Sequence, residues 1–298
     1  MQHAAPAQDR HFAETLIQDY LAEPTHNRIE PGSQERAWDA PLIGIARGDD
    51  PIFESYHEHV DPRHWTPLDA FRLAFPGTDA TAADLAVLAW ILPQTTETRQ
   101  DHRREKELPS RRWALTRKYG EDINAALRSH VVERLGQAGI AACAPVQLKE
   151  WSRVEGGPYV YASTWSERHA AHAAGLGTFG LCDGLITKVG KSIRVGTVVA
   201  RAAWPADPRP YTGHRDWCLF FATGKCGACV KRCPAGALSA SGHDKPKCKA
   251  YIRGVTSPYV ESQLLGVAVN ACGLCQTGVP CEKGIPAALL KRMAAAKA

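Results

Sequence analysis

The sequence lacks two features that would place the protein in a membrane or export it. No stretch approaches the roughly 18 apolar residues that a membrane-spanning helix needs. Residues 1–10 contain neither the apolar run nor the twin arginines of an export signal. We therefore expect a soluble cytoplasmic protein that has no membrane partner.

The chain also has little net charge and no internal repeat beyond two groups of cysteines. Its formal charge of +5 over 298 residues is too small to indicate nucleic-acid binding by itself. With 44% hydrophobic residues, the chain can bury one good core and a smaller module, because domains commonly contain about 100–200 residues. We therefore expect two domains.

Cysteine, in contrast, is abundant and clustered. Eight of the ten cysteines lie in one segment: Cys218, Cys226, Cys229, Cys233, Cys248, Cys272, Cys275 and Cys281. In a reducing cytosol, clustered cysteines are far more often metal ligands or catalytic thiols than disulfides. The run from Cys226 to Pro234 reproduces the C-x2-C-x3-C-P end of the bacterial ferredoxin signature. Because two [4Fe–4S] clusters need eight thiolates, the segment predicts a small two-cluster, bacterial-ferredoxin-like domain over residues 211–290.

The ferredoxin pattern also predicts which cysteines share a cluster, because the last cysteine of one group binds the other cluster. One set of ligands would be Cys218, Cys226, Cys229 and Cys281, and the other Cys233, Cys248, Cys272 and Cys275. A regular motif would place its first cysteine at position 223, which is Thr223, so Cys218 must reach in from a longer loop. The remaining thiols, Cys143 and Cys182, are isolated in the sequence, and we expect them to be structural.

Zinc is the main alternative to iron and sulfur, because two C-x2-C pairs also form a four-thiolate zinc site. Zinc would leave four cysteines without a role. It also gives no reason for the proline that follows Cys233. The iron–sulfur interpretation is therefore favoured, and metal analysis would decide between the two.

The residues before the cysteines predict a mixed helix-and-sheet domain. The apolar run Leu85–Leu92, ended by Pro93, indicates a strand buried on both faces. Residues 184–187 and 194–200 are further strand candidates. The order of elements predicts an α+β or α/β domain over residues 1–204, with its core at about 84–204 and a proline-rich linker after it.

Three helices are predicted in this domain from apolar spacing and capping residues. They cover residues 10–23, a stretch that starts at Asp122 as N-cap, and a stretch that follows the capping-box sequence Thr164–Glu167. The heavily charged segment 94–112 is predicted to be a surface loop outside the core. Gly175 supplies a stop for the third helix.

The block from Ser166 to Gly180, which contains Glu167-Arg168 and Gly175-Leu176-Gly177, resembles the Glu-Arg and Ala-Gly-Leu-Gly segment of epoxyqueuosine reductases and the related cobalamin-dependent reductive dehalogenases. The resemblance covers roughly residues 84–283. It implies a nitroreductase-like α/β domain that holds base-off cobalamin, whose cobalt is reduced by the clusters. The residues it places at the cofactor are Gly175, Leu176, Gly177 and Gly180. The alternative for these glycines is a helix stop followed by a tight turn.

The chain departs from these families in three places. The queuosine enzymes carry a proposed proton-donating Asp where this chain has Tyr161, and the dehalogenases use a Tyr as acid, so Tyr161 is the candidate catalytic acid. The alternative for Tyr161 is a structural aromatic at the domain seam. A family histidine is replaced by Asn124. The helical repeats that grip tRNA in long queuosine enzymes do not follow Cys281, so we do not expect a tRNA substrate.

Two functions remain open at this point. The first is an iron–sulfur reductase that passes electrons from an external donor of the flavodoxin or ferredoxin type to a corrinoid, for chemistry on a small or nucleoside-like substrate. The second is a non-catalytic electron carrier or corrinoid-reactivating partner, whose first domain docks another protein. Turnover by the isolated protein would separate them.

Overall fold

The computed structural model describes residues 9–156 and 160–295 of the chain. Its centre is a four-stranded antiparallel sheet in the order β1-β2-β8-β3. The strands are β1 (Leu42–Arg47), β2 (Leu85–Pro93), β8 (Ile193–Arg201) and β3 (Ala142–Cys143). All nine residues of β2 are buried, which confirms the strand predicted from the apolar run.

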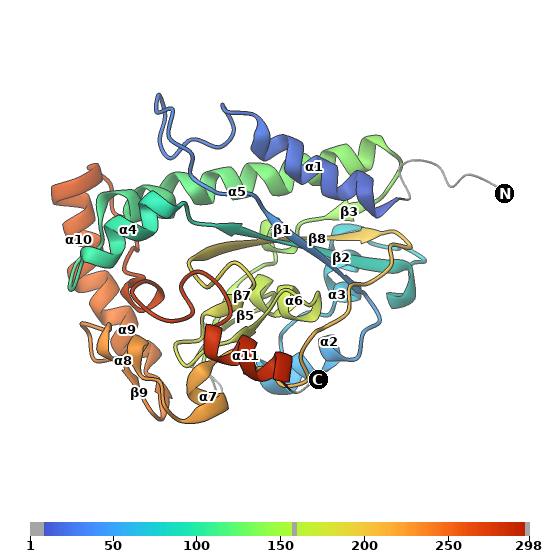
Figure 1. Cartoon of the computed structure of the whole chain (residues 1–298). Helices are drawn as coiled ribbons and strands as arrows, with labels where there is room; N and C mark the ends of the chain where they lie inside the picture. The colour runs from blue at the N-terminus through green and yellow to red at the C-terminus, as the bar shows by residue number, and fades with distance from the viewer. Residues whose placement is uncertain (1–8, 157–159, 296–298) are drawn as a thin grey trace.

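Helices cover both faces of this sheet (Figure 1). Alternate residues of β2 point to opposite faces, because side chains of a strand alternate with a period of two. Val87, Ala89 and Ile91 pack with α2 (Ile52–His59), α3 (Pro67–Ala74) and α6 (Glu167–Ala173). Leu88, Trp90 and Leu92 pack with α1 (Arg10–Ala22) and α5 (Arg111–Gln137). The fold is therefore a mixed arrangement of helices and sheet, as expected.

Short elements complete this part of the chain, which we call the sheet domain (residues 10–204). They are η2 (Ala82–Asp84), α4 (Thr96–Arg104), η3 (Pro145–Gln147), β4 (Arg153–Glu155), β5 (Tyr161–Ser163), β6 (Gly177–Phe179) and β7 (Leu185–Thr187). The strand candidates at 184–187 and 194–200 correspond to β7 and β8. In the described ranges, no helix combines the length and the apolar character needed to cross a membrane.

The prediction of a surface loop over residues 94–112 is wrong. The segment forms α4 and the start of α5, and the side chains of Thr98 and His102 are fully buried. The ring of His102 stacks on that of Trp113, with 4.1 Å between centroids. The charged residues misled the prediction because they occupy the outer face of an amphipathic helix. The start predicted for α5 is wrong as well, because Ser110, and not Asp122, caps its N-terminus.

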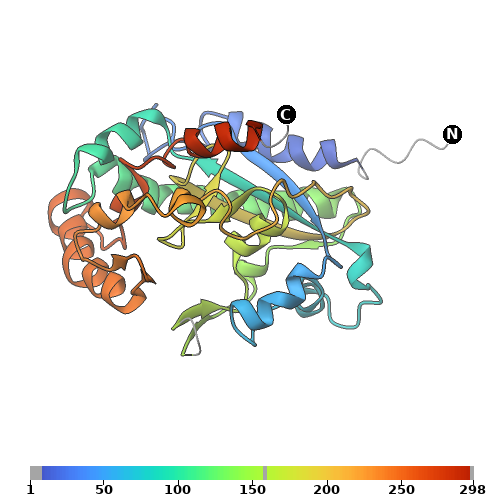
Figure 2. The ribbon, with the colours of Figure 1, turned by 60° about the horizontal axis from the view of Figure 1, so that its bottom comes forward.

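The rest of the described chain, residues 211–295, contains the eight clustered cysteines and is called the cysteine module here. Its elements are α7 (Leu219–Thr223), α8 (Ala228–Lys231), β9 (Leu238–Ser239), β10 (Gly242–His243), α9 (Lys245–Tyr251), η4 (Ile252–Thr256), α10 (Ser257–Tyr259), η5 (Val260–Leu265), η6 (Leu274–Gln276) and α11 (Ala287–Ala295). Figures 1 and 2 show α8 to α10 at one end of the molecule, close to α4.

Polar contacts attach the cysteine module to the sheet domain. Arg103 of α4 donates to Glu282, with 2.6 Å between Nη2 and Oε1, and Glu282 is only 2% exposed. The guanidinium of Arg232 makes a second connection. It donates to the carbonyl oxygen of Glu105, just after α4, at 2.6 Å, and to that of Thr277 in the cysteine module at 3.1 Å. These bonds fix the position of the cysteine loops against α4.

Candidate functional site

Four of the eight clustered cysteines surround one cavity, which we call the first cavity. They are Cys218, Cys226, Cys229 and Cys281, the set that the ferredoxin pattern assigns to a single cluster. Lys191, Gly180 and Leu181 from the sheet domain line the same cavity. The structure therefore brings together side chains that lie more than sixty positions apart in the sequence.

Local structure explains how these cysteines reach the first cavity. Cys218 is the N-cap of α7 and lies at the end of the loop before this helix. Position 223, where a regular motif would have its first cysteine, is the last residue of α7. Gly224 ends α7 in the left-handed conformation, with φ of 68°, and turns the chain back toward Cys226. Cys229 lies on α8, and Cys281 is held next to the buried Glu282.

Cys272, one of the other four cysteines, is partly buried within reach of the charges of two more. Burial, followed by the charges of Cys248 and Cys233, raises the pKa of the Cys272 thiol to about 11. The same thiol is among the charges that raise the pKa of Cys275. Gly273 follows Cys272 with φ of 70°, and the ring of Trp113 occupies the space that a Cβ would need. Trp113 thus positions this turn.

The residues present are of the type that holds iron–sulfur clusters, because cysteine thiolates are their ligands. The eight cysteines lie on short helices and in the loops between them. Burial raises the pKa of Cys281, so its sulfur stays protonated until a metal displaces the proton. In the described part of the chain, no three or more His, Cys, Asp or Glu side chains form a group that could hold a metal ion. The assignment of the eight ligands stays a prediction.

Cys182, which is isolated in the sequence, has a polar partner in the fold. Its sulfur accepts a hydrogen bond from Lys191, with 3.3 Å between Nζ and Sγ. Because the contacts of Cys182 come from folding, no local motif in the sequence announces them. Cys143 is different: it lies in β3, and burial raises its pKa to about 12, as expected of a structural thiol.

A second, open cavity lies beside the first and holds about 590 Å³. Its walls come from the loop after β6, the start of the cysteine module and the β9–β10 hairpin, and include Val160, Leu181, Asp183, Arg215, Phe221 and residues 240–246. Leu181 lines both cavities, so they share a wall at this residue. The second cavity is therefore the larger space next to the four cysteines.

One wall of the second cavity is polar. His243 contacts Asp183, with 3.0 Å between Nδ1 and Oδ2. Burial alone would lower the pKa of His243, but hydrogen bonds to Asp183 and Cys248 outweigh it and raise the pKa to about 9. His243 thus carries a positive charge at neutral pH and connects the cavity wall to the second group of cysteines.

Of the residues predicted to hold a cofactor, Gly180 lines the first cavity, whereas Gly175, Leu176 and Gly177 are packed against the chain itself. Gly175 ends α6 with φ of 76°, and a Cβ there would come 2.6 Å from the carbonyl oxygen of Pro208. A Cβ at Gly177 would collide with the carbonyl of Ile186, its neighbour on β7. Leu176 is 5% exposed and belongs to the core. The helix-stop alternative accounts for Gly175, and the cofactor role of these residues stays a prediction.

Tyr161 lies at the seam between the sheet domain and the cysteine module. It is half-buried on β5, and the ammonium of Lys249 sits over its ring at 4.1 Å from the centroid. Its carbonyl accepts a hydrogen bond from Lys245 at 3.2 Å. The preceding residue, Val160, lines the second cavity. Figure 2 shows the β4–β5 hairpin projecting from the body of the molecule beside the module.

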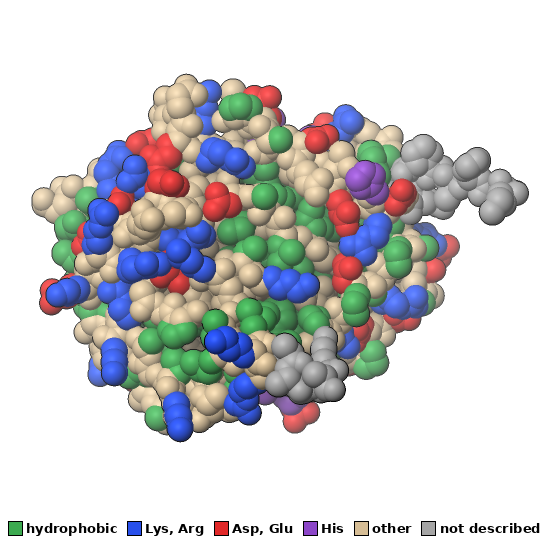
Figure 3. Space-filling model, viewed as in Figure 1, with side chains coloured by type: hydrophobic (Ala, Val, Ile, Leu, Met, Phe, Trp, Pro, Cys, Tyr) green, Lys and Arg blue, Asp and Glu red, His purple; other side chains and the backbone are tan. Residues whose placement is uncertain are grey.

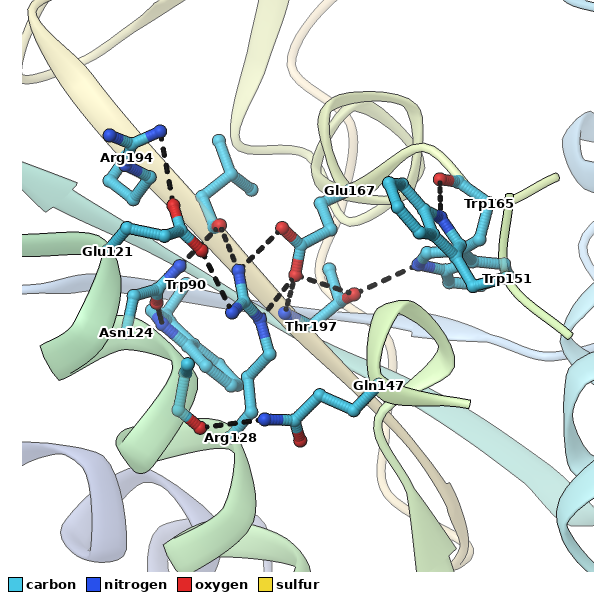
Figure 4. Close-up of polar contacts among 12 residues, drawn as sticks. Trp90, Glu121, Asn124, Arg128, Gln147, Trp151, Trp165, Glu167, Arg194 and Thr197 are labelled. Carbon is cyan, nitrogen blue, oxygen red and sulfur yellow. Dashed lines mark hydrogen bonds and ion pairs between the residues drawn. The ribbon is translucent and has the colours of Figure 1, made fainter. Parts of the chain in front are cut away.

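Glu167, the acid of the resembling block, has a structural role (Figure 4). Both of its carboxylate oxygens lie 2.8 Å from nitrogens of Arg128, and the backbone N–H of Thr197 donates to Oε1 at 3.0 Å. Glu121 joins Arg128 to Arg194 at 3.2 Å from each. Glu167 therefore connects α6 to α5 and β8, and it does not complete the capping box that the sequence suggested.

Comparisons with known proteins agree with the resemblance. No family model matches the chain. Over 128 residues the chain is 30% identical to an epoxyqueuosine reductase of Francisella cf. novicida (strain Fx1), a match that covers 40% of this chain and 33% of that protein. The chain thus spans about a third of the length of the curated relative it matches.

One solved structure gives the same picture for the fold, and a second match is weaker. A crystal structure of an epoxyqueuosine reductase matches with a TM-score of 0.52 and 15% identity, over 93% of this chain and 67% of that chain. A catabolic reductive dehalogenase in complex with 3-bromo-4-hydroxybenzoic acid matches with a TM-score of 0.48 and 15% identity, over 94% and 38%. The chain shares the fold of epoxyqueuosine reductases and is related to them in sequence.

Proposed function

We propose, from this relation and from the cysteine cavity, that the protein is an iron–sulfur reductase that delivers electrons through two [4Fe–4S] clusters. The observation that carries the proposal is the enclosure of one cavity by Cys218, Cys226, Cys229 and Cys281. These are the four ligands expected from spacing alone. In this proposal the sheet domain is the nitroreductase-like part, and the cysteine module is the ferredoxin-like part.

The electron acceptor in this proposal is a corrinoid in the second cavity. That cavity holds about 590 Å³, and Leu181 lines both it and the cavity of the four cysteines. Asp183, Arg215 and His243 would supply the polar contacts of its wall. When bound, a corrinoid supplies a low-potential cobalt that can attack a substrate reductively. Tyr161, one residue from the cavity wall, would donate a proton to a small or nucleoside-like substrate.

An external donor would supply the electrons. The positive charge of the cysteine module supports a donor protein that has an acidic surface. Residues 211–298 contain twelve Lys and Arg against four Asp and Glu, whereas residues 1–210 contain 24 against 27. Figure 3 shows the basic side chains spread over the lower left of the molecule, where the cysteine module lies, with few acidic ones among them. A flavodoxin or ferredoxin type of carrier matches this surface.

One observation favours the second candidate, a non-catalytic electron carrier or corrinoid-reactivating partner. The space beside Gly175 and Gly177 is filled by backbone of the same chain, so these two glycines do not face an open site, and within the block only Gly180 lines the first cavity. In that case the sheet domain would dock another protein. The cysteine module would keep the same clusters.

Anaerobic reconstitution of the full chain tests the proposal. We expect about eight irons and eight sulfides per chain, since two cubanes need that number. Added cobalamin should change its absorption spectrum on binding, and turnover of candidate epoxide or halide substrates should follow with an artificial reductant. Fewer than about four irons would contradict the iron–sulfur claim, whereas full clusters without cobalamin binding or turnover would identify a carrier.

The variant Y161F examines the proton donor separately. If Tyr161 donates the proton, Y161F keeps its iron and binds cobalamin, and its kcat falls about 10²–10⁴-fold, the usual contribution of a general acid. If the ring is a structural aromatic beneath Lys249, Y161F keeps wild-type turnover. Y161F keeps the aromatic ring and its contact with Lys249, so a loss of turnover in this variant reports on the hydroxyl and not on packing.

A further inference from the structure

Lys191 has an environment that the proposed reductase does not by itself explain. Its side chain is 2% exposed, although lysine is among the residues least often buried. It lines the first cavity together with the four cysteines, and its Nζ donates to Cys182 at 3.3 Å. Its ammonium nitrogen is thus held inside the protein, beside sulfurs that would be thiolates with a metal bound.

The backbone holds Lys191 in this position. Its N–H donates to the carbonyl of Cys281 at 3.1 Å. The preceding Gly190 has φ of 96° and packs so closely on Glu282 that a Cβ would collide with the carbonyl oxygen of that residue. The hydroxyl of Thr187 donates to the carbonyl of Gly190 at 2.7 Å and closes the turn. The turn between β7 and β8 is thus fitted to the Cys281 loop.

Cys182 completes this arrangement from the loop after β6. Its sulfur accepts the hydrogen bond of the Lys191 ammonium, and Leu181, the residue before it, lines the first cavity. Lys191 and Cys182 both come from the sheet domain and not from the cysteine module.

We propose that Lys191 is a fixed counter-charge that raises the reduction potential of the cluster held by Cys218, Cys226, Cys229 and Cys281, and that Cys182 orients it without binding iron. The inference rests on the proposed function, because it requires that a cluster is present. When the cluster accepts one electron from an external reductant, its iron–sulfur core goes from 2+ to 1+, and no proton is transferred. A buried ammonium stabilises the added negative charge much more than an exposed one would.

The test is a redox titration of the reconstituted full chain, followed by the EPR signal of the reduced clusters. K191M should make the midpoint potential of one cluster more negative by about 59 mV. For a one-electron step, this shift is about a tenfold change in the ratio of reduced to oxidised protein. The other cluster serves as an internal reference. K188M is the matched control, because Lys188 is exposed in the same turn, and its midpoints should equal those of the wild type.

K191R separates charge from packing. It should keep the wild-type midpoint, and an equal shift in K191R and K191M would overturn the proposal. If K191M fails to assemble one cluster while K191R assembles it, the charge is needed even for assembly, which supports the proposal. Loss of that cluster in both variants would show a packing role and overturn it. A wild type without iron would instead refute the proposed function.

C182A checks the role of Cys182, which lies outside the set of eight predicted ligands. The variant keeps the ammonium and all eight predicted ligands, so it should retain about eight irons per chain. Its midpoints should not become more negative than those of the wild type. Loss of about half the iron would identify Cys182 as a cluster ligand and overturn its assigned role.

Discussion

The sheet domain and the cysteine module are each stabilised internally in a different way. In the sheet domain, one strand is buried along its whole length, and two apolar clusters fill the two faces of the sheet. In the cysteine module, the apolar cluster around the first cavity contains cysteines among its own members, including Cys218 and Cys229. The module also exposes large apolar side chains such as Val255 and Val267, at 42% and 44%.

The difference shows what each part requires in order to fold. Apolar burial stabilises the sheet domain at about 25 cal/mol per Å², without any ligand. A short segment with little core of its own needs cross-links, a metal or a neighbouring surface. The cysteine module has the neighbouring surface, through Arg103 and Arg232, and we propose that the clusters supply the rest.

The largest effect should come from removing the metal. Chelation of the reconstituted protein should increase amide hydrogen exchange in residues 211–290 by more than about tenfold, because metal-binding free energy is folding free energy for such a module. Exchange in β2 and β8 should change much less. Hydrogen exchange followed by mass spectrometry measures both regions in one sample. Equal loosening of both regions would show that they fold as one unit.

The second effect should be confined to the sheet domain. R128M removes the partner of Glu167 and leaves a buried carboxylate, which should cost about 3–5 kcal/mol of unfolding free energy. The matched control is D122N, which breaks the exposed Lys118–Asp122 pair of the same helix and should cost less than about 1 kcal/mol. Urea unfolding followed by tryptophan fluorescence measures the difference. Unchanged stability in R128M would show that the network of Figure 4 is dispensable.

R128M also sharpens the comparison between the two parts. Because Arg128 touches neither cavity, the variant should still bind the wild-type amount of iron at a temperature where it is folded. Iron analysis of the purified variant tests this expectation. Loss of iron would mean that the sheet domain controls cluster assembly through its own stability.

The smallest effect concerns pH. His64 is 2% exposed, accepts a hydrogen bond from the N–H of Ser166, and has its pKa lowered to about 4, mainly by burial. Between pH 6.5 and 4 the unfolded chain therefore binds a proton that the folded chain does not. Stability from this residue is present above pH 6.5 and is lost as the pH falls, by about 2 kcal/mol between pH 7 and pH 5.

H64Q should flatten this dependence, although it also costs some stability at neutral pH. Urea midpoints measured from pH 7 to pH 5 give the slope, and H11Q, at an exposed histidine on α1, should leave it unchanged. Buried His172 also has a lowered pKa and should preserve part of the slope in H64Q. An identical slope in H64Q and the wild type would assign the pH dependence to other groups.

The elements that were predicted well are those whose signal is local. The buried strand β2 follows from one continuous apolar run, and the four cysteines of the first cavity follow from spacing within a short segment. Helix α4 was missed because its pattern mixes charge with buried Thr98 and His102, and the packing of His102 on Trp113 comes only from the tertiary structure.

Spacing along the chain was sufficient to state how many thiolates the protein offers, in what order, and with which metal chemistry they agree, because turns of fixed length bring neighbouring cysteines together. Folding alone determined that Cys182 and Lys191 reach the same cavity and that backbone fills the space beside Gly175. Such contacts join residues from separate elements. They depend on how the sheet, its helices and the cysteine loops pack, which no short stretch of residues encodes.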